Sequence, residues 1–295
     1  MGADLFDQRP DLLGERADEI LGWSLREMCL DADEETLTRT EHAQPALFAL
    51  SYALWAELAK ALATAPQAGA GHSLGEYTAL AAAGAIAYEP ALAVVTERGR
   101  AMAGAADQEE SGMAALLGAE LEQAEAVTLA RRQSGGRLFV ANVNAPGQIV
   151  VAGGVEDLGW LEETAASFGL RRVVRLKVAG AFHSPFMSSA ADRVEAALAG
   201  IHLVPARFPV WSNVTALPYE DGLEKAVLAS QVIKPVRFAD TLAGMAAKGV
   251  DLFVHVGPGD VTVGMAKRSA PGARYLAVSD LASIPDAAQV ISTIA

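Results

Sequence analysis

The stretch AGHSLGEYTALAAAGAI (Ala70–Ile86) places a serine between two glycines, directly before a run of small, helix-forming residues. Gly71–Gly75 fits the pattern G-x-S-x-G, which is typical of a sharp turn between a strand and a helix. Glycines on both sides of Ser73 allow neighbouring backbone to approach without a Cβ clash. Such a turn exposes the hydroxyl at the positive end of the helix, where the N–H of Leu74 can face a developing oxyanion. The pattern predicts a nucleophile, and it is also compatible with a serine that only caps a helix.

A serine nucleophile needs a base, and the sequence offers five histidines. His183, in GAFHSPFM, follows a predicted strand and precedes a predicted helix, so we expect it to be the base. His255, in DLFVHVGPG, is flanked by alternating apolar residues and is expected to be a core or sheet histidine. The remaining histidines offer no such context: His42, His72 and His202.

Composition describes a soluble globular protein of one or two domains, because 52% of the 295 residues are hydrophobic and 20% are charged. The N-terminus has no apolar stretch typical of a secretory signal. The longest run of small apolar residues, around Leu80–Tyr88, is too short to span a bilayer. We therefore expect a cytoplasmic protein without membrane contact.

Charge and cysteine content exclude several classes of partner. The formal net charge of -13 argues against nucleic acid. A single cysteine, Cys29, and scattered histidines predict neither a disulfide nor a metal site. Local basic groups such as Arg171–Arg172 and Lys267–Arg268 are interpreted as solvated surface or, taken together, as a surface for an acidic partner.

Periodicity divides the chain into two kinds of segment. The first hundred residues predict helices: Leu12–Cys29, Pro45–Leu62, Tyr77–Ala87 and Pro90–Met102. In the middle of the chain, strands are predicted over Ser111–Glu120 and Arg171–Val178, and two more strands within Leu138–Gly154 flank an Asn-Ala-Pro-Gly turn. Helices are predicted over Glu120–Ser134 and Glu156–Phe168. This β-α-β-β-α-β order is the ferredoxin-like pattern, so residues 111–178 are predicted to form a small inserted subdomain.

After Gly180 longer helices alternate again with short strands. The predicted helices are Pro185–Ala199, a segment near Gly222–Ser230, and Phe238–Lys248; the predicted strands are FPVWSN, DLFVHVGPG and Tyr275–Val278. Such alternation favours a parallel sheet covered on both faces, with sites at the carboxyl ends of the strands. Residues 1–110 and 179–295 are therefore predicted to form one large α/β subdomain.

Six motifs occur in an order that resembles a known family. They are GHSLGEYTALAAAG, ERGRAM, NAPGQIVVAG, AFHSPFM, WSNV with QVIKPVRF, and VGPGDV. Together they resemble the malonyl-CoA:acyl carrier protein transacylases of fatty-acid synthesis and the acyltransferases of polyketide synthases, both as domains and as discrete trans-acting proteins. The resemblance covers nearly the whole chain. It implies an α/β-hydrolase-like core with an inserted ferredoxin-like subdomain and a site in the cleft between them.

The resemblance also implies roles for individual residues. Ser73 would take the acyl group from coenzyme A, and His183 would deprotonate it and later activate the phosphopantetheine thiol of the carrier protein. The main-chain carbonyl of Gln231 would orient the histidine. Asn213 of WSNV lies in a motif near the site and would have a supporting part.

Acyl specificity is implied at two further positions. Arg98 of ERGRAM matches the arginine that binds the free carboxylate of malonyl, and a planar guanidinium suits a carboxylate because it donates two parallel hydrogen bonds. Outside this context Arg98 would be interpreted as a surface residue of a polar helix. Phe182 matches the form associated with malonyl, because a bulky ring leaves little room for a methyl branch.

The family also has a strand and a GQGSQ-type turn, which supplies a second oxyanion donor, upstream of the stretch that matches MGADLF. The printed sequence begins after that position. Three interpretations remain: a start recorded too late, a fragment of a longer chain, or an altered family member. We favour the first two, because the other motifs are intact.

The sequence thus predicts a monomeric malonyltransferase that needs no cofactor and has malonyl-CoA and an acyl carrier protein as its partners. One alternative is a serine hydrolase or thioesterase that pairs Ser73 with His255 and either Asp240 or Asp251. Another is a catalytically impaired module that only docks a carrier protein, through basic groups near Arg171 and Lys267.

Overall fold

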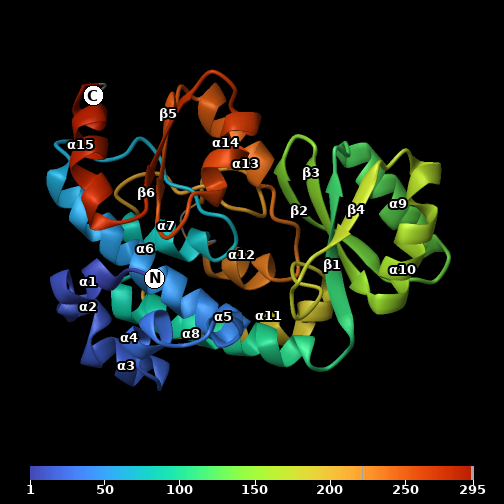
Figure 1. Cartoon of the computed structure of the whole chain (residues 1–295), viewed down its shortest axis with the longest axis horizontal. Helices are drawn as coiled ribbons and strands as arrows, with labels where there is room; N and C mark the ends of the chain where they lie inside the picture. Colours follow the sequence, from blue (N-terminus) through green and yellow to red (C-terminus); the bar gives the residue numbers. More distant parts are fainter. Residues whose placement is uncertain (221, 223, 294–295) are drawn as a thin grey trace.

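The middle of the chain forms a four-stranded antiparallel sheet in the computed structural model, which describes residues 1–220, 222 and 224–293. The strands lie in the order β2-β3-β1-β4. Their bounds are β1 Ser111–Leu117, β2 Leu138–Ala145, β3 Gln148–Gly154 and β4 Arg172–Arg175. Two helices, α9 (Leu121–Gln133) and α10 (Val155–Thr164), complete the predicted β-α-β-β-α-β order. The ferredoxin-like prediction is confirmed (Figure 1).

Alternation along β1 explains how this sheet joins the rest of the molecule. Ala114 and Leu116 pack into the cluster beneath α9 and α10, whereas Met113 and Ala115 belong to a second cluster with residues of other helices. Successive side chains of a strand point to opposite faces. The sheet is therefore buried on both faces at β1, against its own helices on one side and against the larger part of the protein on the other.

The larger part is an α/β core. Its central helices are α6 (Thr40–Ala61), α7 (Gly75–Ala82), α8 (Tyr88–Ala106) and α11 (Ser188–Ala199). Strands β5 (Leu252–Val256) and β6 (Arg274–Val278) pair in parallel, and an isolated parallel bridge joins Gly69 to Val210. Helices α12 (Glu224–Gln231), α13 (Phe238–Ala247), α14 (Val261–Ser269) and α15 (Ile284–Ser292) follow. The predicted α/β class, with an α/β-hydrolase-like core, is confirmed.

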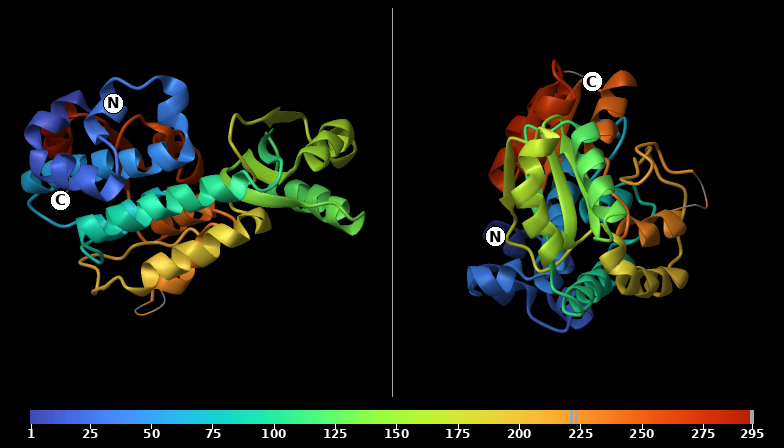
Figure 2. Two further views of the ribbon diagram at one scale, coloured as in Figure 1. Left: turned by 90° about the horizontal axis from the view of Figure 1, so that it is seen from below. Right: turned by 90° about the vertical axis from the view of Figure 1, so that its right-hand side faces the viewer.

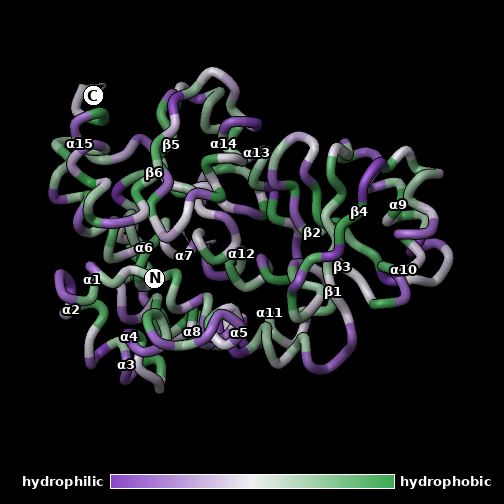
Figure 3. Tube along the Cα trace, viewed as in Figure 1, coloured by the Kyte–Doolittle hydropathy of each residue, from purple (hydrophilic) through white to green (hydrophobic). Residues whose placement is uncertain are grey.

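Two long helices connect the parts. In Figure 2, α8 runs from the α/β core to the start of β1, with α11 alongside it. The hydropathy tube in Figure 3 alternates between apolar and polar colours along the peripheral helices, as expected where each helix buries one face. None of the helices in residues 1–220 and 224–293 combines the length and apolarity that crossing a bilayer requires.

Several local predictions differ from the structure. The single helix expected over Leu12–Cys29 is broken into α2 (Pro10–Leu13), α3 (Glu15–Leu21) and α4 (Leu25–Leu30), because Gly22 adopts a left-handed φ of 80° and Ser24 caps a new helix. Helices α1 (Ala3–Gln8) and α5 (Glu34–Thr38) flank them.

Further differences concern a helix end, a proline and a strand. The helix expected over Tyr77–Ala87 ends at Ala82, since Gly84 adopts a left-handed φ of 76°. Pro45 lies inside α6 rather than in its first turn, since the helix already begins at Thr40. FPVWSN forms single bridges at Val210 and Trp211 instead of a regular strand. Part of the helix expected near Gly222 falls on residues 221 and 223, outside the described residues. Short 3-10 helices occupy Ala165–Phe168, Pro185–Met187 and Leu281–Ser283.

Candidate active site

Ser73 occupies a sharp turn before α7, with a left-handed φ of 51°. Two side chains hold its backbone: its N–H donates to Asn213 Oδ1 at 2.6 Å, and its carbonyl accepts from Gln231 Nε2 at 2.9 Å. Non-glycine residues seldom adopt such a φ, so the surrounding contacts must maintain it. The turn therefore depends on residues about 140 and 158 positions further along the chain.

The two glycines of the turn have different environments. A Cβ on Gly71 would lie 2.0 Å from the backbone of Gly75, so only glycine fits there. A Cβ on Gly75 would meet no heavy atom of the described residues within 4 Å. The expectation that both glycines permit close backbone approach is correct for Gly71 and wrong for Gly75.

His183 lies within hydrogen-bond distance of the serine hydroxyl. Its Nε2 is 2.8 Å from Ser73 Oγ, and its Nδ1 is 3.0 Å from the main-chain oxygen of Gln231. Because a carbonyl only accepts, Nδ1 carries the proton and Nε2 presents a lone pair to the hydroxyl. Burial, together with the positive charge of Arg98, lowers the pKa of His183 to about 3. The imidazole is therefore neutral and able to accept the proton of Ser73.

Arg98 is 1% exposed and reaches the same hydroxyl from α8. One terminal nitrogen donates to Ser73 Oγ at 3.0 Å and to Gln231 Oε1 at 2.8 Å, and the other donates to Gln44 Oε1. Its Nε has no hydrogen-bond partner, and no carboxylate forms an ion pair with it, in the part of the chain that the structure describes. Burial lowers the pKa of the guanidinium. A buried cation without a counter-ion favours an anionic ligand.

The N-terminus of α7 supplies a hydrogen-bond donor beside Ser73. Leu74 is the N-cap residue, and its N–H donates to no acceptor within residues 1–220, 222 and 224–293. A free N–H at the positive end of a helix can stabilise negative charge on an oxygen bound to Ser73.

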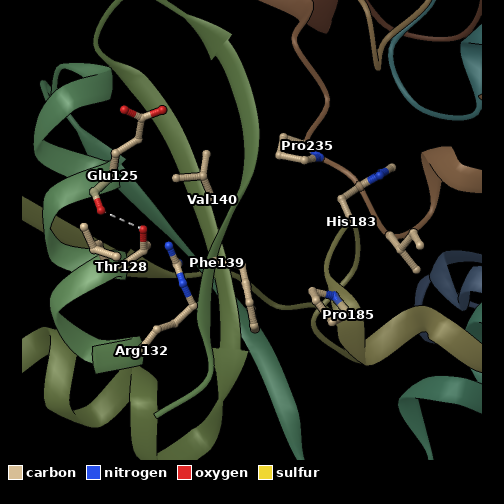
Figure 4. A pocket seen from close by; sticks show the side chains of 10 residues that line it. Glu125, Thr128, Arg132, Phe139, Val140, His183, Pro185 and Pro235 are labelled. Atoms are coloured by element: carbon tan, nitrogen blue, oxygen red, sulfur yellow. Dashed lines mark hydrogen bonds between the residues drawn. The ribbon is translucent and has the colours of Figure 1, made fainter. Parts of the chain in front are cut away.

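A cleft of about 480 Å³ leads to His183 (Figure 4). One wall comes from α9 and β2 of the small sheet and the other from the chain around Pro185 and Pro235. The lining is mainly apolar, with three polar or charged groups on α9: Glu125, Thr128 and Arg132. The site thus lies between the two parts of the molecule, where a long, narrow ligand could reach the histidine.

The structure brings most of the predicted site residues together: Ser73, Leu74, Arg98, His183, Asn213 and Gln231. Phe182 is half-buried beside an apolar cluster that includes Ala181 and Phe186, and its part in specificity stays a prediction. Across the described residues, no group of three or more histidine, cysteine or carboxylate side chains is arranged to bind a metal ion.

The triad of the hydrolase alternative is not assembled. His255 is on β5, with Nδ1 2.7 Å from Thr262 Oγ1 and Nε2 3.0 Å from the carbonyl of Gly257. Asp240 and Asp251 form exposed ion pairs with Arg237 and Arg274. His255 thus has a structural environment, as predicted, and the histidine beside the serine is His183.

Two residues of the site were missed in the sequence. Gln44 contacts Arg98, and Glu76 contacts Gln231. Glu76 carried a signal, because it is the only charged residue of an otherwise apolar helix. Gln44 stands directly before the apolar run of α6 that begins at Pro45, and it carried a weaker signal.

These groups define a class of enzyme. A serine hydroxyl, a neutral imidazole, a free N–H and an unpaired guanidinium can form and break an ester whose acyl group carries an anion. That is the chemistry of acyl transfer through a serine-bound intermediate.

Comparisons with known proteins agree with this class. The acyl transferase domain family matches residues 1–284, and the chain belongs to it. A malonyl CoA-acyl carrier protein transacylase of Bacillus subtilis is 38% identical over 294 residues, which cover 99% of this chain and 92% of that protein. A polyketide biosynthesis malonyl CoA-acyl carrier protein transacylase of the same organism is 37% identical, with 91% of each chain covered.

Solved structures show the same likeness. An acyl-carrier-protein S-malonyltransferase from Bartonella henselae superposes with a TM-score of 0.93 at 31% identity, covering 99% of this chain and 95% of that one. A malonyl-transacylase in complex with a type II polyketide synthase acyl carrier protein gives 0.91 at 31% identity, with 98% and 93% covered.

Proposed function

We propose that the protein transfers a malonyl group from coenzyme A to the phosphopantetheine thiol of an acyl carrier protein, in fatty-acid or polyketide synthesis. The observation that carries the proposal is the position of Ser73 Oγ, 2.8 Å from His183 Nε2 and 3.0 Å from a guanidinium nitrogen of Arg98. The names of the relatives and the carrier-protein complex support the same reaction.

In the first half-reaction His183 removes the proton of Ser73 as the oxygen attacks the malonyl thioester. The developing oxyanion accepts a hydrogen bond from the N–H of Leu74. Coenzyme A leaves with the proton from His183, and a malonyl ester remains on Ser73. The contact between Gln231 O and Nδ1, at 3.0 Å, stabilises the imidazolium in the place where many hydrolases use a carboxylate.

In the second half-reaction the carrier-protein thiol gives its proton to His183 and attacks the ester. The serine oxygen leaves and regains that proton. The apolar cleft, which ends at His183, suits the slender phosphopantetheine arm of either thiol substrate.

Selectivity for malonyl comes from Arg98. Its guanidinium pairs with the free carboxylate of malonyl, and an uncharged acyl group would leave this buried cation unpaired. Phe182 would restrict a methyl branch on the same acyl group. The proposal includes no cofactor, a cytoplasmic location and a monomer.

Incubation with radiolabelled malonyl-CoA tests the proposal directly. Label should appear on the protein, be absent in Ser73→Ala, and move to added holo carrier protein. Loss of label to water at the same rate with and without the carrier protein would instead indicate a hydrolase. Comparison of His183→Ala with His255→Ala separates the two bases, since only the former should abolish labelling.

A further inference from the structure

Glu76 is a fully buried carboxyl group that the reaction above does not use. It is the second residue of α7, three positions after Ser73. Its Oε1 accepts from the backbone N–H of Asn213 at 3.1 Å and from the hydroxyl of Tyr219, and its Oε2 accepts from Gln231 Nε2. Neither lysine nor arginine forms an ion pair with it among the described residues.

Gln231 connects this carboxyl to the reacting groups. Its amide nitrogen donates to Glu76 and to the carbonyl of Ser73, the latter at 2.9 Å. Its amide oxygen accepts from Arg98 at 2.8 Å, and its main-chain oxygen contacts His183. One residue thus contacts the nucleophile, the base and the anion-binding arginine.

Donor and acceptor roles fix the orientation of this amide. The carbonyl of Ser73 only accepts and the guanidinium of Arg98 only donates, so the NH₂ group of Gln231 must face Ser73 and its oxygen must face the guanidinium. A reversed amide would direct NH₂ at Arg98 and oxygen at the carbonyl of Ser73, which places donor against donor and acceptor against acceptor.

We propose that Glu76 is a positioning residue for Arg98: through the amide of Gln231 it holds the guanidinium beside Ser73 Oγ, in place to receive the acyl carboxylate. The inference rests on the proposed function, because it assumes that Arg98 binds that carboxylate. Burial also raises the pKa of Glu76 to about 7, and the donors around it oppose that rise. Three hydrogen bonds compensate the desolvated carboxyl group, and one of them comes from the amide that also contacts Arg98.

Glu76→Gln tests the proposal at nearly constant shape. An amide at this position offers only one acceptor oxygen. If that oxygen faces Asn213 N–H, the new NH₂ meets the NH₂ of Gln231; if it faces Gln231, the new NH₂ meets Asn213 N–H. Tyr219→Phe is the matched control, because it removes a donor to Oε1 and leaves the contact between Oε2 and Gln231 intact.

The measured quantity is a ratio of two rates: acylation of the protein by malonyl-CoA, and hydrolysis of p-nitrophenyl acetate, a neutral ester that does not need Arg98. In Glu76→Gln this ratio should fall about ten- to hundredfold, as expected for loss of one hydrogen bond to a charged group, with most of the fall in KM for malonyl-CoA. In Tyr219→Phe it should stay within about twofold of wild type, since the bond to Gln231 remains.

Arg98→Ala provides the reference. If Arg98→Ala lowers the ratio and Glu76→Gln does not, the positioning role is wrong while the proposed function stands. If Arg98→Ala itself leaves the ratio unchanged, the proposed function fails instead. Should Glu76→Gln not fold, Gln231→Met replaces it: the main-chain carbonyl at His183 remains, the amide is lost, and an unchanged ratio would overturn the inference.

Discussion

Replacement of Arg98 by alanine tests the physical basis of substrate choice. A guanidinium that pairs with a carboxylate through two charge-assisted hydrogen bonds contributes about 1.5–3 kcal/mol for each bond. Loss of both corresponds to about 3–6 kcal/mol, or roughly a 10²- to 10⁴-fold fall in kcat/KM for malonyl-CoA. An uncharged acetyl group makes neither bond, so the rate with acetyl-CoA should change much less and the preference for malonyl should collapse.

Stability should change far less than activity. The substitution leaves acceptors on Gln44 and Gln231 without their donor, which costs about 1–3 kcal/mol for each buried group. It also removes a buried cation that has no counter-ion, and burying such a charge costs several kcal/mol. Because these terms oppose each other, we expect the free energy of unfolding to change by about 2 kcal/mol or less.

The assay is single-turnover acylation of Ser73 with malonyl-CoA and with acetyl-CoA, together with urea unfolding of each variant. Arg98→Lys is the control, because it keeps the positive charge and loses the planar pair of donors. Its preference for malonyl should lie between those of wild type and Arg98→Ala. A folded Arg98→Ala variant that still prefers malonyl as strongly as wild type would refute this reasoning.

Three further predictions concern the turn and the base. Gly71→Ala should abolish labelling of Ser73 because its Cβ would lie 2.0 Å from backbone, whereas Gly75→Ala, with open space around its Cβ, should fold with an unchanged urea midpoint. Asn213→Ala should lower the free energy of unfolding by about 1–3 kcal/mol, because two partly buried backbone groups of the turn lose their hydrogen bonds. Asn213→Asp, which keeps the acceptor for Ser73 N–H, should lose less. The ordinary pKa of histidine is 6.5, and that of His183 in the folded protein is about 3. Between these two pH values His183 binds a proton in the unfolded chain and not in the folded one, so the histidine lowers the free energy of unfolding as pH falls. His183→Ala should therefore gain about 2 kcal/mol relative to wild type between pH 6.5 and 5, measured by urea unfolding at each pH, and no gain would contradict the low pKa.

The small sheet shows how much local pattern can predict. Short apolar runs around an Asn-Ala-Pro-Gly turn, with helical segments between them, predicted the β-α-β-β-α-β order, because these signals are local. The large core was less predictable. FPVWSN has the composition of a strand, yet it forms only isolated bridges, since pairing depends on where distant backbone lies.

The candidate site likewise has a part that the local sequence predicts and a part that depends on tertiary contacts. The turn around Ser73 could be predicted because the need for glycine at position 71 is local. Glu76 and Gln44 were missed because a polar residue in an apolar helix does not indicate its partner. Only folding brings Gln231 to Ser73 across 158 positions and gives the carboxyl of Glu76 its donors.

The sequence by itself determined the kinds of chemistry available: a hydroxyl in a tight turn, an imidazole after a strand and an arginine on a helix. It also determined the short apolar runs that form the small sheet. Tertiary structure alone decided that these groups meet at one oxygen, that the imidazole is neutral and that the arginine has no counter-ion among the described residues. The physical reason is that a short motif specifies local backbone and residue type, whereas distance, burial and pKa depend on chain segments that only packing brings together.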